Sequence, residues 1–212
     1  HRPVLPPDIV PREKLISRWE EMRKRPVTLI SAPAGYGKST LACLMTEACD
    51  CPHSWLSVDE EENDLHTFLI HIVAAIEESF PGACDVTRTL MQDAEPAPAS
   101  DLGRHLVNDL FNIQSPFILV LDDFHKIREE AVHELMSVLM NHPPQNLHLI
   151  LLTRRDFPLL TSKLRGRGQI NEIGVADLYF SVDETASFLK HALGRSIDAK
   201  RLETIQEALE GW

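Results

Sequence analysis

The stretch LISAPAGYGKSTLACLM, residues 29–45, joins an apolar run to a helical pattern through a glycine-rich turn. Residues 27–31 (VTLIS) predict a buried strand, and residues 38–48 (KSTLACLMTEA) predict a helix from the spacing of their apolar side chains. A strand, a glycine-rich turn, a lysine and a helix in this order are typical of a loop that binds phosphate through its backbone N–H groups. The stretch therefore predicts an α/β fold built around a nucleotide site.

The loop supplies the groups that a bound nucleotide phosphate requires. Gly35 and Gly37 permit the positive φ angles that turn several backbone N–H groups toward one anion. Lys38 would neutralise the β- and γ-phosphates, and the Ser39 hydroxyl would be a ligand of Mg²⁺. Ala32 replaces the glycine with which this pattern usually begins, at a position that contributes little to phosphate binding. The segment expected to bind the nucleotide comprises Ala34, Gly35, Tyr36, Gly37, Lys38, Ser39 and Thr40.

Apolar runs and helical patterns alternate along the rest of the chain, which predicts a layered α/β fold with a mostly parallel sheet. Residues 116–124 (PFILVLDDF) show no alternation of polar and apolar side chains, as expected for a strand buried on both faces. Further strands are expected at 54–59, 146–156 and 168–174, helices at 64–79, 101–113 and 128–142, and an irregular connection rich in Pro and Ala at 81–100.

The pattern becomes entirely helical near residue 176. Ser181 and Glu184 have the spacing of a capping box at the start of one helix, and Asp198 is placed to cap the next. We therefore expect a nucleotide-binding domain over residues 1–176. Residues 177–212 would be the start of a small helical domain that the end of the chain cuts short.

Charged side chains follow two of the predicted strands. Asp122 is placed to hold Mg²⁺, and Asp123 is placed to polarise the attacking water. Two carboxylates after an apolar run are by themselves weak evidence for a site of nucleotide hydrolysis. The phosphate loop about 80 residues upstream strengthens that evidence. If the strand at 146–156 lies between the first and third strands, its end points toward the γ-phosphate. Arg154, in preference to Arg155, would then sense or stabilise the charge there, so the expected catalytic residues are Asp123 and Arg154.

Composition excludes several classes of protein. The chain has 212 residues, is 43% hydrophobic and carries a net charge of −11, whereas a surface that binds nucleic acid is normally basic. No apolar run reaches the length of a membrane span, and we expect a cytoplasmic protein. Four cysteines are too few for a disulfide scaffold. Cys49 and Cys51 could suggest a metal site, but no second Cys or His pair stands at zinc spacing. We therefore expect reduced thiols in or near the core.

Five segments together resemble the STAND-class ATPases, and more closely the MalT-like large ATP-binding regulators of the LuxR type. They occur in the same order and with similar spacing over nearly the whole chain. The segments WLSVDEEEND and ADLYFSVDETASFL discriminate best, because many nucleotide hydrolases share the loop. The segments are SAPAGYGKSTL, WLSVDEEENDLHTFLIHIVAAI, FILVLDDFHKI, LTRRDFPLL and VADLYFSVDETASFL.

This resemblance implies a P-loop domain of the additional-strand type, related to AAA+ and STAND domains, with sheet order 2-3-4-1-5. It also implies that ATP and ADP with Mg²⁺ set a switch. In that family, inducer binding to a C-terminal sensor and ATP lead to self-association, and DNA is bound by a C-terminal helix-turn-helix. The segment IVPRE resembles the family's adenine-contacting segment, which makes Ile9, Val10 and Arg12 candidates, although Pro11 stands where relatives often have Gly. Hydrolysis would be slow and would reset the state.

Two other functions share the same loop. A P-loop kinase for a small molecule would need an arginine-rich lid, and residues 154–167 (RRDFPLLTSKLRGR) are the one stretch able to imitate it. The carboxylate pair followed by an arginine is more typical of hydrolytic switches than of kinases. A STAND signalling protein outside transcription would share the site, and it would differ only in modules beyond this chain.

Overall fold

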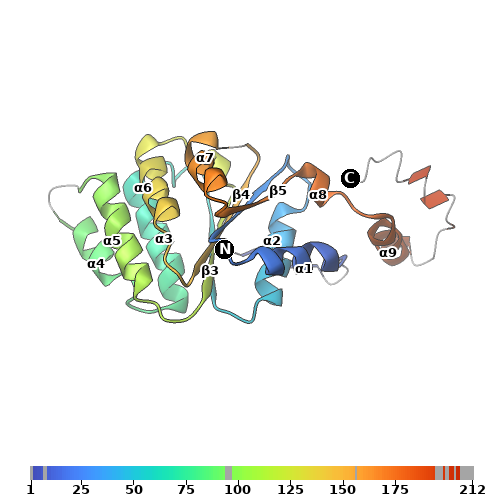
Figure 1. Ribbon diagram of the computed structural model, residues 1–212, viewed down its shortest axis with the longest axis horizontal. Coiled ribbons are helices and arrows are strands. Elements are labelled where there is room, and N and C mark those ends of the chain that lie inside the picture. The colour runs from blue at the N-terminus through green and yellow to red at the C-terminus, as the bar shows by residue number, and fades with distance from the viewer. Residues whose placement is uncertain are drawn as a thin grey trace.

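The structure is a computed structural model that describes residues 2–6, 9–93, 97–155, 157–193, 198, 201–202 and 204–205. Five parallel strands form one sheet at its centre, in the order β2-β3-β4-β1-β5 (Figure 1). The strands are β1 (Val27–Ser31), β2 (His53–Ser57), β3 (Phe117–Asp122), β4 (Leu147–Thr153) and β5 (Ile170–Ile173). The α/β fold with a five-stranded parallel sheet in this order, expected from the sequence, is confirmed.

Strand register brings the functional segments to one edge of the sheet. Ser31, which precedes the phosphate loop, is paired with Thr153 at the end of β4. Asp122, at the end of β3, is paired with Ser57 of β2. All residues of β3 and β4 are buried, because helices cover both faces of these central strands. The apolar runs thus form buried strands, and the polar residues at their C-terminal ends meet at the carboxyl edge of the sheet.

Helices form a layer on each face of the sheet (Figure 1). One apolar core lies between the sheet and α3, α5 and α6, and the other lies between the sheet and α1 and α2. No helix in the described residues has the length and apolar character to cross a membrane. The helices on the two faces are α1 (Glu13–Met22), α2 (Lys38–Ala48), α3 (Leu65–Ser79), α4 (Asp85–Met91), α5 (Ala99–Phe111), α6 (Glu130–Asn141) and α7 (Pro158–Gly166).

The expected irregular connection at 81–100 is wrong in part, because it contains helix α4. Thr87 anchors this short helix, since its backbone N–H and its hydroxyl both donate to Asp109 Oδ2 of α5, at 2.8 and 2.7 Å. Seven residues give too few apolar positions for a helical period to be recognised. Helices α1 and α7 were likewise not predicted. A short 3₁₀ turn, η1 (Phe124–Lys126), follows β3.

The expectation of reduced thiols is also wrong for two of the four cysteines. Cys49 and Cys51 form a disulfide, with their Cα atoms 5.3 Å apart, whereas Cys43 and Cys84 are buried and free. The cause is a tight turn after α2, in which the Cys51 N–H donates to the Cys49 carbonyl at 2.8 Å. This turn places both side chains on the same side of the chain, within the distance that a disulfide spans.

Two helices follow the sheet, α8 (Val175–Leu178) and α9 (Val182–Leu193). The capping box at the start of α9 is confirmed: the Ser181 N–H donates to Glu184 Oε2 at 2.8 Å, and the Glu184 N–H donates to Ser181 Oγ at 3.3 Å. Asp198 Oδ1 accepts from the Arg201 N–H, as expected of a cap, and most of the helix predicted beyond it lies outside the described residues. The domain boundary near residue 176 stays a prediction.

Candidate nucleotide-binding site

The loop between β1 and α2 has a backbone shape suited to phosphate. Gly35 and Gly37 have φ angles of 86° and 72°, which turn successive N–H groups toward one side. Among the residues that the structure describes, Asp123 is the one non-glycine with positive φ, so Ala32 has an ordinary backbone conformation. The Ala32 N–H donates to the Thr153 carbonyl at 3.2 Å, which holds the start of the loop on β4. Alanine is accommodated here because no left-handed φ is needed.

Lys38, the first residue of α2, lies inside this loop. Its side chain folds back so that Nζ donates to the Pro33 carbonyl at 2.8 Å. Burial lowers the pKa of Lys38, the positive charge of Arg154 lowers it further, and the carboxylates of Asp123 and Asp122 oppose both effects. No side chain caps the N-terminus of α2, so its first N–H groups remain for another acceptor. A phosphate here would meet these N–H groups and the ammonium together.

Asp122 ends β3 within reach of the same helix. The Ser39 hydroxyl hydrogen-bonds its carboxylate, and Asp122 Oδ1 also accepts from the Asp123 N–H at 2.8 Å. Burial raises the pKa of Asp122, and the negative charge of Asp123 adds to this rise. A buried carboxylate and a hydroxyl in contact fit a magnesium ion that also takes phosphate oxygens and water as ligands. The residues therefore suit Mg²⁺ bound together with a nucleotide.

Asp123 stands apart from Asp122 because its backbone is left-handed, with φ 57°. Its carboxylate is the more exposed of the two, and it lies 3.9 Å from Arg154 Nη2 and 3.4 Å from Lys126 Nζ. Strand β4 lies between β3 and β1, which is the condition on which the role of Arg154 depended. Arg154 thus lies beside the carboxylates, while the Arg155 N–H and carbonyl both hydrogen-bond Thr153 Oγ1. The two residues expected to be catalytic, Asp123 and Arg154, are brought together.

A pocket of about 300 Å³ opens beside the loop, on its α2 side. Its lining is largely apolar and comes from three separated parts of the chain: the N-terminal segment, the phosphate loop with α2, and the segment from α8 to α9. An apolar slot next to a phosphate loop suits the base of a nucleotide. The lining residues are Pro6, Ile9, Val10, Arg12, Gly35, Tyr36, Gly37, Thr40, Leu41, Leu178, Phe180 and Phe188.

Arg12 lines this pocket, but its guanidinium is engaged with the helical segment. Nε donates to Glu184 Oε1 at 2.9 Å, and Nη1 donates to the Leu178 carbonyl at 3.0 Å. Nη2 donates to the carbonyls of Asp177 and Tyr179, and the group stacks 5.0 Å above the Phe180 ring. Arg12 therefore joins the N-terminal segment to the segment that closes the pocket.

The sequence interpretation did not identify all the residues around the site. Leu178, Phe180 and Phe188 line the pocket from more than 130 residues downstream of the loop, and no local pattern links them to it. His125 Nδ1 lies 3.7 Å from Asp123 Oδ1, and burial lowers the pKa of this imidazole. The position of His125, two residues after Asp123, is a signal that could have placed it near the phosphates.

Comparison with known proteins agrees with this geometry. The AAA ATPase domain family matches residues 12–152. The HTH-type transcriptional regulator MalT of Yersinia pestis (strain Pestoides F) is 34% identical over 212 residues, which is 100% of this chain and 23% of that protein. MalT of Yersinia enterocolitica serotype O:8 / biotype 1B is 34% identical over 211 residues, again with 23% of its length covered. The chain thus spans about a quarter of the length of these relatives.

Solved structures share the fold at lower sequence identity. A signal transduction ATPase with numerous domains (STAND) with a tetratricopeptide repeat sensor, from Pyrococcus horikoshii, matches with a TM-score of 0.70 and 18% identity, over 99% of this chain and 29% of that one. A Walker-type ATPase of Pyrococcus abyssi matches with a TM-score of 0.58 and 19% identity, over 96% and 64%. The resemblance to STAND-class and MalT-like proteins expected from the sequence is confirmed.

Proposed function

Because this chain belongs to the AAA ATPase domain family, we propose that it is the ATP- and ADP-binding switch module of a MalT-like transcriptional regulator of the LuxR type. The phosphate loop, with Gly35, Gly37 and Lys38, would hold the phosphates. Ser39 and Asp122 would hold Mg²⁺, which neutralises phosphate charge when bound. The base would enter the apolar pocket beside Val10 and the other lining residues.

One observation carries the switch interpretation: three distant parts of the chain close the pocket together. Arg12 holds the N-terminal segment against α8 and α9, and the phosphate loop forms the floor between them. A nucleotide in this pocket would contact all three parts at once. A ligand shifts a conformational equilibrium by its difference in affinity for the two states. The γ-phosphate, which distinguishes ATP from ADP, would face Arg154 beside Asp122 and Asp123. It would thereby change how the three parts of the chain pack around the nucleotide.

Hydrolysis would reset this state. Asp123 would orient the attacking water and accept its proton, and Arg154 would stabilise the charge that develops on the γ-phosphate. Asp123 already lies 3.4 Å from Lys126 Nζ and 3.9 Å from Arg154 Nη2, so its carboxylate is engaged by two cations before a water binds. We therefore propose a slow ATPase, in which turnover times the switch.

The wider role belongs to the protein of which such a module is a part. We propose that an inducer acts through a sensor outside this chain, that the ATP state self-associates, and that DNA is bound by a separate domain in the cytoplasm. The net charge of −11 supports this division, because the module itself would repel DNA. The relatives named as HTH-type transcriptional regulators support it as well.

The structure disfavours the kinase alternative. Its lid would need the arginines of residues 154–167 to face the phosphates. Instead, Arg165 is bound to Glu172 of β5 through Nε and Nη2, at 3.0 and 2.6 Å. Helix α7 packs on α6 and β5. A STAND signalling protein outside transcription shares every feature of the site, and the relatives favour the transcriptional role.

Nucleotide content and turnover test the proposal. We expect the purified chain to retain or tightly bind ADP, and to hydrolyse ATP slowly or not at all by itself. Lys38→Ala should weaken ADP binding by about 100-fold, because it removes a charge-assisted contact to phosphate, with the fold unchanged by circular dichroism. Lys24→Ala, at an exposed lysine, is the matched control. Rapid turnover that requires an added small-molecule acceptor would contradict the switch, and unchanged ADP affinity in Lys38→Ala would contradict the site.

A further inference from the structure

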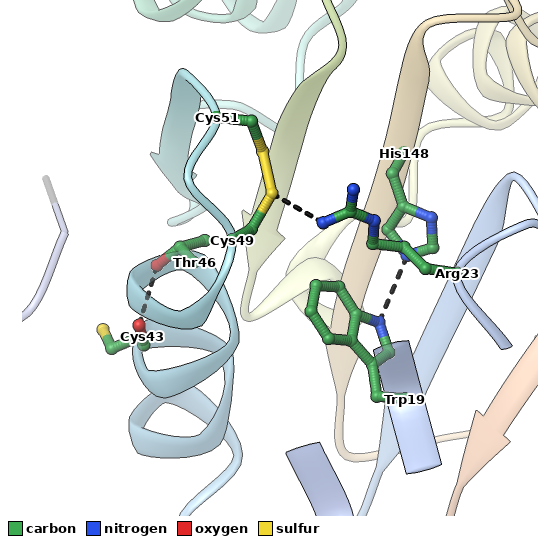
Figure 2. The surroundings of a disulfide bond; sticks show 7 residues. All are labelled: Trp19, Arg23, Cys43, Thr46, Cys49, Cys51 and His148. Carbon is green, nitrogen blue, oxygen red and sulfur yellow. Dashed lines mark hydrogen bonds between the residues drawn. A yellow bond between two sulfur atoms is a disulfide. The ribbon is translucent and has the colours of Figure 1, made fainter. Parts of the chain in front are cut away.

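The Cys49–Cys51 disulfide lies at the end of α2 that is remote from the phosphate loop (Figure 2). Next to it, a hollow of about 160 Å³ is lined by Cys51, Arg23, Gln145, Asn146 and His148, among others. This hollow is separate from the nucleotide pocket, and none of its lining residues has a role in the proposed nucleotide site. The bond therefore needs an explanation of its own.

The fold does not depend on this bond. A disulfide stabilises a protein mainly by lowering the conformational entropy of the unfolded chain, and this effect grows with the number of residues between the cysteines. Here the cysteines are only two positions apart. The backbone on either side is already held. The Cys49 N–H donates to the Met45 carbonyl at 3.1 Å, and the Ile118 N–H of β3 donates to the Pro52 carbonyl at 3.0 Å. Reduction of the bond would leave these hydrogen bonds in place.

The two sulfur atoms have different surroundings. Cys49 is buried, with 6% of its surface exposed, and Arg23 Nη1 donates to its Sγ at 2.7 Å (Figure 2). Cys51 is only partly buried, and it faces the hollow. A guanidinium beside a sulfur stabilises the thiolate, and the more stable thiolate is the better leaving group in thiol–disulfide exchange. Cys51 is thus the accessible sulfur, and Cys49 is the sulfur suited to leave.

Arg23 also selects the kind of thiol that fits. Its guanidinium lines the hollow and lies 5.8 Å above the Trp19 ring, which fixes its position. His148, the other basic side chain of the hollow, is buried and has its pKa lowered to about 4 by that burial, so it is neutral at pH 7. Arg23 is then the positive charge that faces an incoming molecule here. A thiol that carries a carboxylate matches it.

We propose that the Cys49–Cys51 disulfide is a reversible redox site, at which a small thiol bearing a carboxylate becomes bonded to Cys51. The thiolate attacks Cys51 Sγ, the bond between Cys51 and Cys49 breaks, and its electron pair leaves on Cys49 beside Arg23. A second thiolate then attacks the sulfur of the bound thiol. This step releases a small disulfide and leaves Cys51 as a thiolate. In sum, two thiols are oxidised to one small disulfide, and the protein disulfide is reduced to two thiols.

Single-cysteine variants test which sulfur reacts. The 212-residue chain carrying Cys49→Ser, and the same chain carrying Cys51→Ser, are treated with oxidised glutathione, and adducts are located by peptide mass mapping. We expect the adduct on Cys51 to form about tenfold faster than the adduct on Cys49, because Cys49 is buried. Burial raises the pKa of Cys43, and that of Cys84 to about 12, so both should remain unmodified. Equal rates at the two sulfurs would overturn the assignment of Cys51.

Reduction of the native bond tests the role of Arg23. With reduced glutathione, the unsubstituted chain should lose its disulfide about tenfold faster than Arg23→Met, because the variant lacks the cation beside the leaving sulfur. Arg18→Met removes an exposed arginine of α1 and should match the unsubstituted rate. Circular dichroism checks that each variant is folded. An Arg23→Met rate equal to that of the unsubstituted chain would overturn the proposal. A reduced chain in which oxidised glutathione fails to re-form the Cys49–Cys51 disulfide would overturn it as well.

Discussion

At the scale of single residues, Lys38 and Asp122 show how the site is prepared for a charged ligand. Burial lowers the pKa of the ammonium and raises the pKa of the carboxylate, so each ionised form is disfavoured by its surroundings. A phosphate beside Lys38 and a cation beside Asp122 would each reverse the shift. Perturbed pKa values of this kind cluster at functional sites.

Mutation of Asp123 should affect ATP hydrolysis without affecting nucleotide binding. Asp123→Asn keeps the size of the side chain and removes its capacity to accept a proton, so we expect ADP affinity within about threefold of the unsubstituted chain and ATP turnover lowered by about 100-fold or more. Single-turnover hydrolysis and ADP titration measure the two effects. Asp85→Asn, at an exposed carboxylate, is the control. A variant that binds ADP poorly but hydrolyses at the original rate would contradict the role of Asp123.

His148 should make stability depend on pH. Its side chain is buried, with Nε2 2.9 Å from Thr28 Oγ1, and its pKa is lowered to about 4 from an ordinary 6.5. Between these values the unfolded chain binds the proton that the folded chain excludes. The free energy of unfolding should therefore fall by about 3 kcal/mol as the pH drops from 6.5 to 4.

Urea denaturation at several pH values measures this dependence. His148→Gln should flatten the dependence of stability on pH across that window. His66→Gln, at an exposed histidine, should leave it in place. An equal slope in the chain carrying His148→Gln would show that another group is responsible.

At the scale of elements, prediction succeeded where a segment carries its own pattern. The range of α2 was predicted to the residue, and Asp64 caps α3 by accepting from the Thr67 N–H. Helix α4 was not found, because its anchor is a long-range bond from Thr87 to Asp109 rather than a periodic apolar face. The same reason explains which site residues could be predicted. The phosphate loop and the carboxylates after β3 have local sequence patterns, whereas Phe180 and Phe188 reach the pocket only through the tertiary fold.

The contact between α5 and α6 depends on Gly103. A Cβ at this position would lie 3.1 Å from Val138 Cβ and 3.2 Å from the Leu135 carbonyl oxygen, and the latter belongs to helix backbone. Gly103→Ala should therefore destabilise the fold by about 1–3 kcal/mol, despite the higher helix propensity of alanine. Gly166→Ala in α7 is the control, because a Cβ there meets no atom within 4 Å, and it should be neutral or slightly stabilising. Thermal unfolding compares the two, and equal stabilities would contradict the close approach.

At the scale of the whole molecule, the site joins the two ends of the described chain. The phosphate loop and the carboxylates lie at the ends of sheet strands, whereas the pocket is completed by the N-terminal segment and by α8 and α9. Arg12 and Glu184 are separated by 172 positions in sequence and form a contact at 2.9 Å. Nucleotide affinity should therefore report on whether this contact is made.

A double-mutant cycle on Arg12 and Glu184 distinguishes a link between segments from a direct contact to the nucleotide. If Arg12 acts through the helical segment, Arg12→Met and Glu184→Gln should each weaken ADP binding by about 3–10-fold, and the double variant should be little worse than either. Arg18→Met, which removes the more exposed pair with Asp177 between α1 and α8, should change ADP affinity by less than about twofold. Isothermal titration gives the affinities. If Arg12 instead contacts the nucleotide directly, Glu184→Gln alone should hardly change ADP affinity. Arg12→Met should then weaken ADP binding by the same factor with and without Glu184→Gln.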